Sequence, residues 1–158
     1  MKKIVLMVLV LALSLVGMGS AATEINECMV LDDEGETYEL NASIIDHNPT
    51  CFTIGADDIT LDCKNYNIDG AKSTYDAVAV EATDVSGFTL KNCNITDWRR
   101  GVVLEDVDSV TIEDNIFVSE YFGDAYGIYL EDSTEVAIDD NEIEYNSTGD
   151  EKVAYGIY

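Results

Sequence analysis

Hydrophobic and polar residues alternate in short runs along most of the chain, and Gly, Asn or Asp residues separate these runs. Short alternating runs that are rich in β-branched residues and bounded by turn formers are typical of β-strands joined by tight turns. No window has the 3.6-residue period of an amphipathic helix, so the sequence predicts an all-β chain. The alternating pairs are Ile59/Leu61, Val80/Ala82, Phe88/Leu90, Val102/Leu104, Val110/Ile112, Ile128/Leu130 and Val136/Ile138.

The alternating runs recur in the same order along the chain. GVVLEDVDSVTIEDN at Gly101–Asn115 aligns with GIYLEDSTEVAIDDN at Gly127–Asn141, 26 residues later. AVEATDVSGFTLKNC at Ala79–Cys93 follows the same template 22 residues before the first of these. CFTIGADDITLDC at Cys51–Cys63 also fits, with one residue fewer in the turn. Internal repeats of roughly 20–50 residues are the signature of solenoids, propellers or arrays.

Three short strands per repeat, with their inward residues in register, predict a parallel β-helix of about four coils stacked roughly 4.8 Å apart. We expect residues 23–50 to cap the stack and residues 51–158 to form its repeats. The pentapeptide AYGIY, at Ala125–Tyr129 and again at Ala154–Tyr158, marks the first strand of each late coil. Because the second copy ends the chain without a polar cap, we expect a fragment of a longer β-helix. A small antiparallel sandwich would also contain many short strands, but it does not predict aligned columns.

Asn115 and Asn141 follow the second strand of their repeats at equivalent positions, and Cys93 holds that position one repeat earlier. Asparagines stacked at an inward turn can bond from coil to coil through their side-chain amides. The sequence therefore predicts an asparagine ladder, with ordinary turn formation as the alternative.

The first residues have the layout of a secretory signal peptide. Lys2 and Lys3 precede an apolar run at Ile4–Val16, and Ser20-Ala21-Ala22 forms a small-residue cleavage site. The apolar run is short for a membrane span, which needs about 20 residues. We therefore expect residues 1–22 to be removed and the rest to be exported, with an uncleaved N-terminal anchor as the alternative.

The chain carries a formal net charge of −24. Such a surface excludes nucleic acid, whose phosphates require neutralisation by Lys and Arg, and it disfavours anionic membranes and polyanionic ligands. Strongly acidic chains are often disordered, but 47% hydrophobic residues in a regular pattern argue against disorder here. A surface with this charge is compatible with high solubility, with a high salt concentration or with binding of divalent cations.

All four cysteines, Cys28, Cys51, Cys63 and Cys93, lie in the N-terminal half of the exported part. An even number outside the cell favours disulfides, for which three connectivities exist. We predict Cys28–Cys51 with Cys63–Cys93, and the sequence leaves the other two connectivities open.

Three Asn-x-Ser/Thr triplets mark candidate N-glycosylation sites at Asn41, Asn94 and Asn146. A further triplet at Asn48 is blocked by the proline that follows it. Such triplets also arise by chance.

GETYELNASI at Gly35–Ile44, followed by Cys51 and by FTIGADDITLDCKNYNIDG at Phe52–Gly70, resembles the opening of right-handed parallel β-helix proteins. These are the NosD-like proteins and the carbohydrate-binding and sugar-hydrolase (CASH) group. The shared pattern is a Gly-x-Tyr-x-Leu strand, a cysteine and an Ile-x-Leu-Asp strand. The resemblance covers almost the whole exported chain and implies a right-handed solenoid of an archaeal-type cell envelope. It does not specify activity, because this scaffold carries lyases, hydrolases, binding modules and structural repeats.

Asp84, Asp106 and Asp132 occupy equivalent turn positions in three successive repeats. In a β-helix they line up about 5 Å apart on the outside, where two like charges in water cost about 0.8 kcal/mol. Carboxylate oxygens are ligands of Ca²⁺, so the column is a candidate calcium site and Ca²⁺ is the candidate cofactor. A solvated acidic column is the alternative that we favour.

DWRRG at Asp97–Gly101 is the basic cluster of the exported chain. Here Trp98 is a candidate to stack on a sugar ring, and Arg99 and Arg100 to bind a sugar carboxylate. The alternative is a coil-to-coil turn whose arginines balance an acidic surface. Catalysis by a glycoside hydrolase would need two carboxylates across a groove, and one sequence does not show that convergence.

Aromatic residues gather in the last two repeats, where they would either face a polysaccharide or form ladders that stabilise the sheet. The sequence therefore predicts a secreted or cell-surface module, without catalytic residues, that presents a rigid face to carbohydrate or to other envelope proteins. A polysaccharide lyase or glycoside hydrolase is the alternative. The aromatic residues are Tyr121, Phe122, Tyr126, Tyr129, Tyr145, Tyr155 and Tyr158.

Overall fold

A computed structural model describes residues 21–158, except residues 73–75, 122 and 148–152. The predicted signal peptide, residues 1–22, therefore lies almost entirely outside the described residues. Every regular element within the described ranges is a β-strand. In that part of the chain, no helix is long and apolar enough to cross a membrane.

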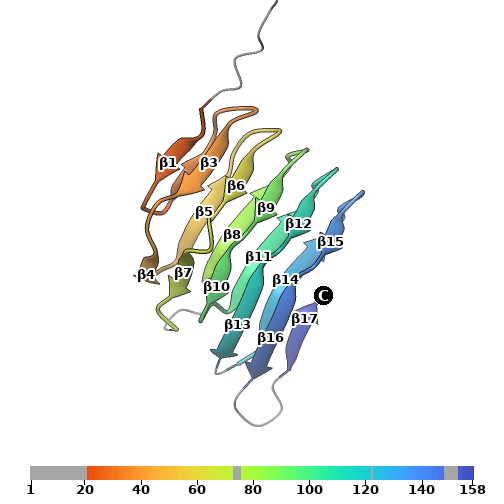
Figure 1. The fold of residues 1–158 in the computed structure, drawn as a ribbon. Coiled ribbons are helices and arrows are strands. Elements are labelled where there is room, and N and C mark those ends of the chain that lie inside the picture. The colour runs from red at the N-terminus through yellow and green to blue at the C-terminus, as the bar shows by residue number, and fades with distance from the viewer. Residues whose placement is uncertain (1–20, 73–75, 122, 148–152) are drawn as a thin grey trace, which may run out of the picture.

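The strands form three parallel sheets that the chain visits in a fixed order (Figure 1). Sheet A contains β1 (Thr23–Ile25), β3 (Thr37–Leu40), β6 (Thr60–Asp62), β9 (Thr89–Lys91), β12 (Thr111–Glu113) and β15 (Ala137–Asp139). Sheet B contains β2 (Met29–Leu31), β5 (Thr50–Ile54), β8 (Val78–Thr83), β11 (Arg100–Glu105), β14 (Ala125–Glu131) and β17 (Ala154–Ile157). Sheet C contains β4 (Ile44–His47), β7 (Asn67–Gly70), β10 (Asn94–Thr96), β13 (Ile116–Tyr121) and β16 (Glu142–Ser147).

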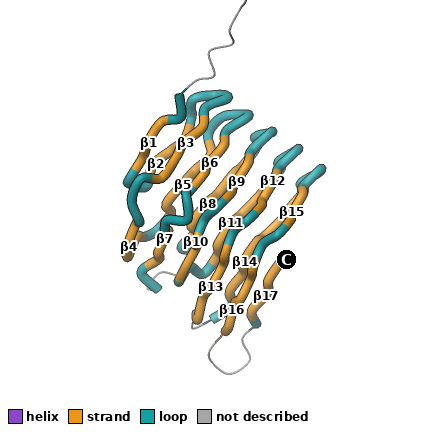
Figure 2. The backbone as a smooth tube through the Cα atoms, in the orientation of Figure 1, coloured by secondary structure: helices purple, strands orange, loops and turns teal. Residues whose placement is uncertain are grey.

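Each turn of the solenoid adds one strand to each sheet, so the predicted parallel β-helix is confirmed. Within the described residues, β3–β5, β6–β8, β9–β11, β12–β14 and β15–β17 make about five turns, one more than the sequence predicted. The additional turn comes from residues 23–50, which were expected only to cap the stack. This segment covers the N-terminal end of the stack as strands of the same sheets, and the turns between strands lie one above another (Figure 2).

The core consists of columns of apolar side chains that run along the solenoid axis. In sheet A the register joins Leu61 to Leu90, Leu90 to Ile112 and Ile112 to Ile138. The first three of these side chains are fully buried, and each such burial contributes about 1.5–3 kcal/mol. The parallel columns are Phe52, Val80, Val102 and Ile128 in sheet B, and Ile68, Ile95, Phe117 and Ile143 in sheet C.

Both predicted disulfides form, and each joins two neighbouring turns. The Cα atoms are 4.5 Å apart in Cys28–Cys51 and 4.7 Å apart in Cys63–Cys93. These distances match the spacing of paired strands, about 4.7–4.9 Å, so stacking alone brings each pair of cysteines within bonding range. The pairing that the sequence left open follows from the register of the turns.

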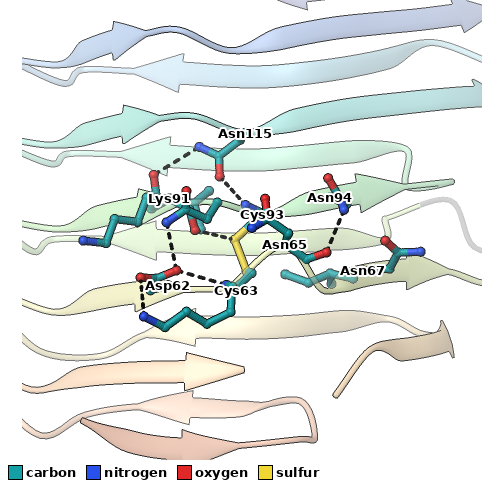
Figure 3. The surroundings of a disulfide bond; sticks show 12 residues. Asp62, Cys63, Asn65, Asn67, Lys91, Cys93, Asn94 and Asn115 are labelled. Atoms are coloured by element: carbon teal, nitrogen blue, oxygen red, sulfur yellow. Dashed lines mark hydrogen bonds and ion pairs between the residues drawn. A yellow bond between two sulfur atoms is a disulfide. The ribbon is translucent and has the colours of Figure 1, made fainter. Parts of the chain in front are cut away.

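The asparagine ladder is also confirmed, at the corner between sheets A and C, and Figure 3 shows Asn115 beside Cys93. Asn115 Oδ1 accepts a hydrogen bond from the backbone N–H of Cys93, and Asn115 Nδ2 donates to the carbonyl oxygen of Leu90. Asn141 Oδ1 in turn accepts from the backbone N–H of Asn115, and Asn141 Nδ2 donates to the carbonyl oxygen of Ile112. The asparagine side chains therefore form hydrogen bonds with backbone N–H and C=O groups that are buried at this corner.

Candidate functional site

No ligand-sized pocket is present in the part of the chain that the structure describes. Candidate binding residues are therefore those that project from the outer faces of the three sheets. The most distinctive group is on sheet B, in the last two turns. We name Tyr126, Tyr129, Tyr155 and Tyr158 the tyrosine cluster.

The tyrosine cluster consists of two stacked pairs, and both pairs cross the same step between the last two described turns. The ring centroids of Tyr126 and Tyr155 are 5.3 Å apart with an interplanar angle of 4°, and those of Tyr129 and Tyr158 are 5.4 Å apart at 14°. Rings in direct face-to-face contact would be closer, so both pairs are offset-stacked.

Edge-to-face contacts join the two stacks into one unit. Tyr126 contacts Tyr129 at 79°, and Tyr155 contacts Tyr158 at 65°, with centroids 5.8 Å and 4.9 Å apart. The hydroxyl of Tyr129 also donates to Glu131 Oε2 at 2.8 Å, and this bond raises the pKa of Tyr129. The four rings are held in fixed orientations, so they lose little entropy when they contact a partner.

The repeated AYGIY sequence explains where the four rings lie. Tyr126 pairs with Tyr155 in the register of β14 and β17, and Ile128 pairs with Ile157. Ile128 is fully buried, whereas Tyr126 and Tyr129 are half-buried on the outer face. A Cβ at Gly127 would lie 2.6 Å from the carbonyl oxygen of Gly156, so only glycine permits this close approach of the two strands.

The two predicted sugar-binding arginines border the tyrosine cluster and already have protein partners. Arg100 pairs in register with Tyr126, one turn before it. Arg99 donates from Nε to the carbonyl oxygen of Asp124 and from Nη1 to Asp76 Oδ1, and Arg100 Nη2 lies 3.6 Å from the same oxygen. Arg99 and Arg100 therefore have the alternative role, in which they balance acidic residues between coils, here Asp76. Binding of a sugar carboxylate by Arg99 and Arg100 stays a prediction.

The prediction that Trp98 stacks on a sugar is wrong for this structure, because Trp98 is fully buried. Its indole Nε1 donates to the carbonyl oxygen of Ile68 at 3.0 Å, and the ring fills a corner beside Gly70.

Tyr145 is likewise buried, so it does not belong to the exposed aromatic group. Burial raises the pKa of Tyr145. Tyr145 lies two residues after the inward-facing Ile143 in the same strand, so alternation along the strand predicts that Tyr145 also faces inward.

The acidic column is present as predicted, since Asp84, Asp106 and Asp132 each follow register-paired residues of sheet B. All three are exposed and have positive φ angles of 55°, 53° and 46°, a conformation that Asp tolerates better than most residues. Among the described residues, no three His, Cys, Asp or Glu side chains are grouped so that they could hold a metal ion. Calcium binding at this column stays a prediction.

A second charged column runs along sheet A, where Lys91 lies in register between Asp62 and Glu113. The ion pair at Asp62 is formed by Lys64, whose Nζ lies 3.2 Å from Asp62 Oδ2 and 2.8 Å from Glu39 Oε1. Burial alone would raise the pKa of Asp62, but hydrogen bonds from Asn92 and Lys64 outweigh it and hold that pKa below its usual value. The contacts of Lys64 with Glu39 and of Asn92 with Asp62 therefore join neighbouring turns at this corner.

The three glycosylation candidates differ in their surroundings. Asn41 and Asn146 are exposed, and their side-chain amides bond to Glu24 and Glu144. Asn94 is half-buried in β10, where its Nδ2 donates to the carbonyl oxygen of Asn65 at 2.8 Å. Glycosylation at all three stays a prediction.

Comparison with known proteins agrees with the architecture. The family model described as "Right handed beta helix region" matches residues 19–158. Neither the search of curated proteins nor that of solved structures found a match.

Proposed function

The chain belongs to the right-handed β-helix family, and we propose that it is an exported, non-catalytic module that binds carbohydrate through the tyrosine cluster. The resemblance to NosD-like and CASH proteins and to archaeal envelope proteins supports this role. Two disulfides, which are typical of oxidising compartments, support export to the cell surface.

The observation that carries the proposal is the gathering of four oriented tyrosine rings on one outer face. An aromatic ring offers an apolar face to the C–H groups of a sugar, and the phenol hydroxyl offers a hydrogen bond. The rings are fixed by their contacts with one another, so the face is preorganised for a rigid ligand.

The charge of the chain indicates which carbohydrates fit. A net charge of −24 repels anionic glycans over the whole surface, and the neighbouring Arg99 and Arg100 are already engaged by Asp76. The proposed ligand is therefore a neutral glycan.

A second candidate is an envelope protein. Tyr and Arg are enriched at the energetic centres of protein–protein interfaces, and this face combines both residue types. A glycan is favoured because four aromatic rings in fixed orientations offer several neighbouring contacts to the C–H groups of a sugar.

Affinity electrophoresis in gels that contain neutral or acidic polysaccharides tests the proposal. We expect at least one neutral glycan to retard the protein, and the double substitution Tyr126→Ala and Tyr155→Ala to abolish the retardation. The matched control is Tyr66→Ala, which removes an exposed tyrosine outside the cluster and should leave retardation unchanged. Release of sugar products would favour the lyase or hydrolase alternative. Equal retardation of the double variant and the control would exclude the tyrosine cluster as the site.

A further inference from the structure

The second stacked pair of the cluster, Tyr129 and Tyr158, has a geometry suited to covalent coupling. Their ring centroids are 5.4 Å apart and nearly parallel, with an interplanar angle of 14°. The two backbones are held together, because Tyr158 N–H donates to the carbonyl oxygen of Ile128 and Leu130 N–H donates to that of Tyr158. Tyr129 is only half-buried on the outer face of sheet B, so a soluble oxidant can reach the pair.

The position of this pair parallels that of the disulfides. Cys28–Cys51 and Cys63–Cys93 tie neighbouring turns together in the first part of the stack. All four cysteines precede residue 94, so the later turns have no cysteine with which to form such a bond. Tyr129 and Tyr158 occupy stacked positions of two late turns, as the cysteines do in earlier ones.

We propose that Tyr129 and Tyr158 are an oxidative modification site at which a dityrosine crosslink joins the last two turns of the sheet. The oxidant is a peroxide acting through a one-electron catalyst of the peroxidase class. Each phenol loses one electron and its hydroxyl proton to give a phenoxyl radical. The two radicals form one C–C bond between the ring carbons next to the hydroxyls, and the displaced ring hydrogens return to the oxygens as the rings become aromatic again.

The reaction balances without any group from the protein. Two tyrosines lose two electrons and two protons in total, and one hydrogen peroxide takes these up to give two water molecules. The crosslinked chain is therefore lighter than the starting chain by two hydrogen atoms.

A hydrogen bond distinguishes this pair from the neighbouring Tyr126 and Tyr155. The Tyr129 hydroxyl donates to Glu131 Oε2 at 2.8 Å, and this carboxylate can accept the proton as the electron leaves. Removal of an electron from a phenol is much easier when its proton moves at the same time to a nearby base. Tyr129 is therefore the site at which the first radical forms, and Tyr158 is the stacked partner that couples with it.

The test is light-driven one-electron oxidation of the chain in dilute solution, followed by intact mass measurement, dityrosine fluorescence and peptide mapping. We expect a monomeric product that has lost two hydrogens, with peptides containing Tyr129 and Tyr158 joined. Tyr158→Phe keeps the ring and the fold but should eliminate this product. Glu131→Gln should slow its formation, and Tyr66→Phe should leave it unchanged.

Three results would overturn the proposal. The first is a crosslink that forms only between molecules, seen as a dimer on a denaturing gel. The second is a crosslink mapped to Tyr126 and Tyr155 or to tyrosines outside the cluster. The third is an undiminished yield in Tyr158→Phe. None of these outcomes depends on glycan binding, because the glycan test substitutes Tyr126 and Tyr155.

Discussion

The side chain of Asn115 bonds directly to that of Asn141 in the next turn, with Asn115 Nδ2 donating to Asn141 Oδ1 at 3.0 Å. The other Nδ2 hydrogen bonds the carbonyl oxygen of Leu90, and Asn115 Oδ1 accepts the backbone N–H of Cys93. Asn115 is 1% exposed, so water cannot replace any of these partners. One buried amide therefore links three successive turns.

Replacing Asn115 with alanine should destabilise the fold by about 2–4 kcal/mol, because the N–H of Cys93 and the C=O of Leu90 would be left buried without partners. Urea unfolding followed by the fluorescence of Trp98, the single tryptophan, measures the change. The control is Asn67→Ala, since Asn67 is half-buried on the outer face of sheet C and its loss should cost under about 0.5 kcal/mol. Equal losses in the two variants would show that the ladder is not a special source of stability.

The fold could be predicted because alternation and repeat length are local properties of the sequence. Val110 and Ile112 face inward as their spacing indicates, and the shared repeat sets Ile112 beside Leu90. Trp98 could not be placed in this way. It lies at a corner, where the chain leaves sheet C for sheet B and alternation no longer applies. Its polar neighbours suggested a surface position, whereas the space beside Gly70 in the preceding turn makes it a core residue.

The candidate site could be predicted only in part for a related reason. The sequence placed Tyr129 on the outside, because it follows the inward-facing Ile128. It did not show which rings stack, since contacts such as Tyr126 with Tyr155 depend on the register of two strands 29 residues apart. The same holds for Arg99, whose partners Asp76 and Asp124 lie in loops of different turns.

Trp98→Ala should destabilise the fold by about 3–5 kcal/mol, because it removes a fully buried indole and leaves the carbonyl oxygen of Ile68 without its donor. Thermal unfolding followed by circular dichroism measures the loss. Below the melting temperature, Trp98→Ala should still be retarded by the neutral glycan that retards the parent chain. Loss of glycan binding by a fully folded Trp98→Ala protein would show that the binding face depends on this buried indole.

The two disulfides should differ in their resistance to reduction. Cys28 is partly exposed, whereas Cys63 and Cys93 are fully buried, and a thiolate must reach the sulfur that it attacks. Under native conditions we expect a small thiol to reduce Cys28–Cys51 before Cys63–Cys93. Alkylation of samples taken over time, followed by peptide mass analysis, gives the order. In a denaturant the two rates should converge, and a native order that is reversed would contradict the burial argument.

The stability contributed by Asp62 should depend on pH. Hydrogen bonds from Asn92 and Lys64 hold its folded-state pKa below the ordinary value of about 3.9, so its contribution is fully present above that value. This contribution is lost as the pH falls through the lower folded-state pKa. Urea unfolding of the parent chain and of Asp62→Asn should therefore differ most near neutral pH and least in strong acid. A difference that does not change with pH would mean that the charge of Asp62 is unimportant.

Asp106→Asn tests the acidic column, because the two interpretations of that column predict changes of opposite sign. Asp106 lies one turn from both Asp84 and Asp132, so removing its charge relieves two repulsions if the column is only solvated. We expect the melting temperature to rise slightly in low salt with a chelator present, and the gain to shrink as salt screens the charges. If the column instead binds calcium, added Ca²⁺ will raise the melting temperature of the parent chain more than that of Asp106→Asn. Identical melting curves of the parent chain with Ca²⁺ and with chelator would exclude calcium binding at this column.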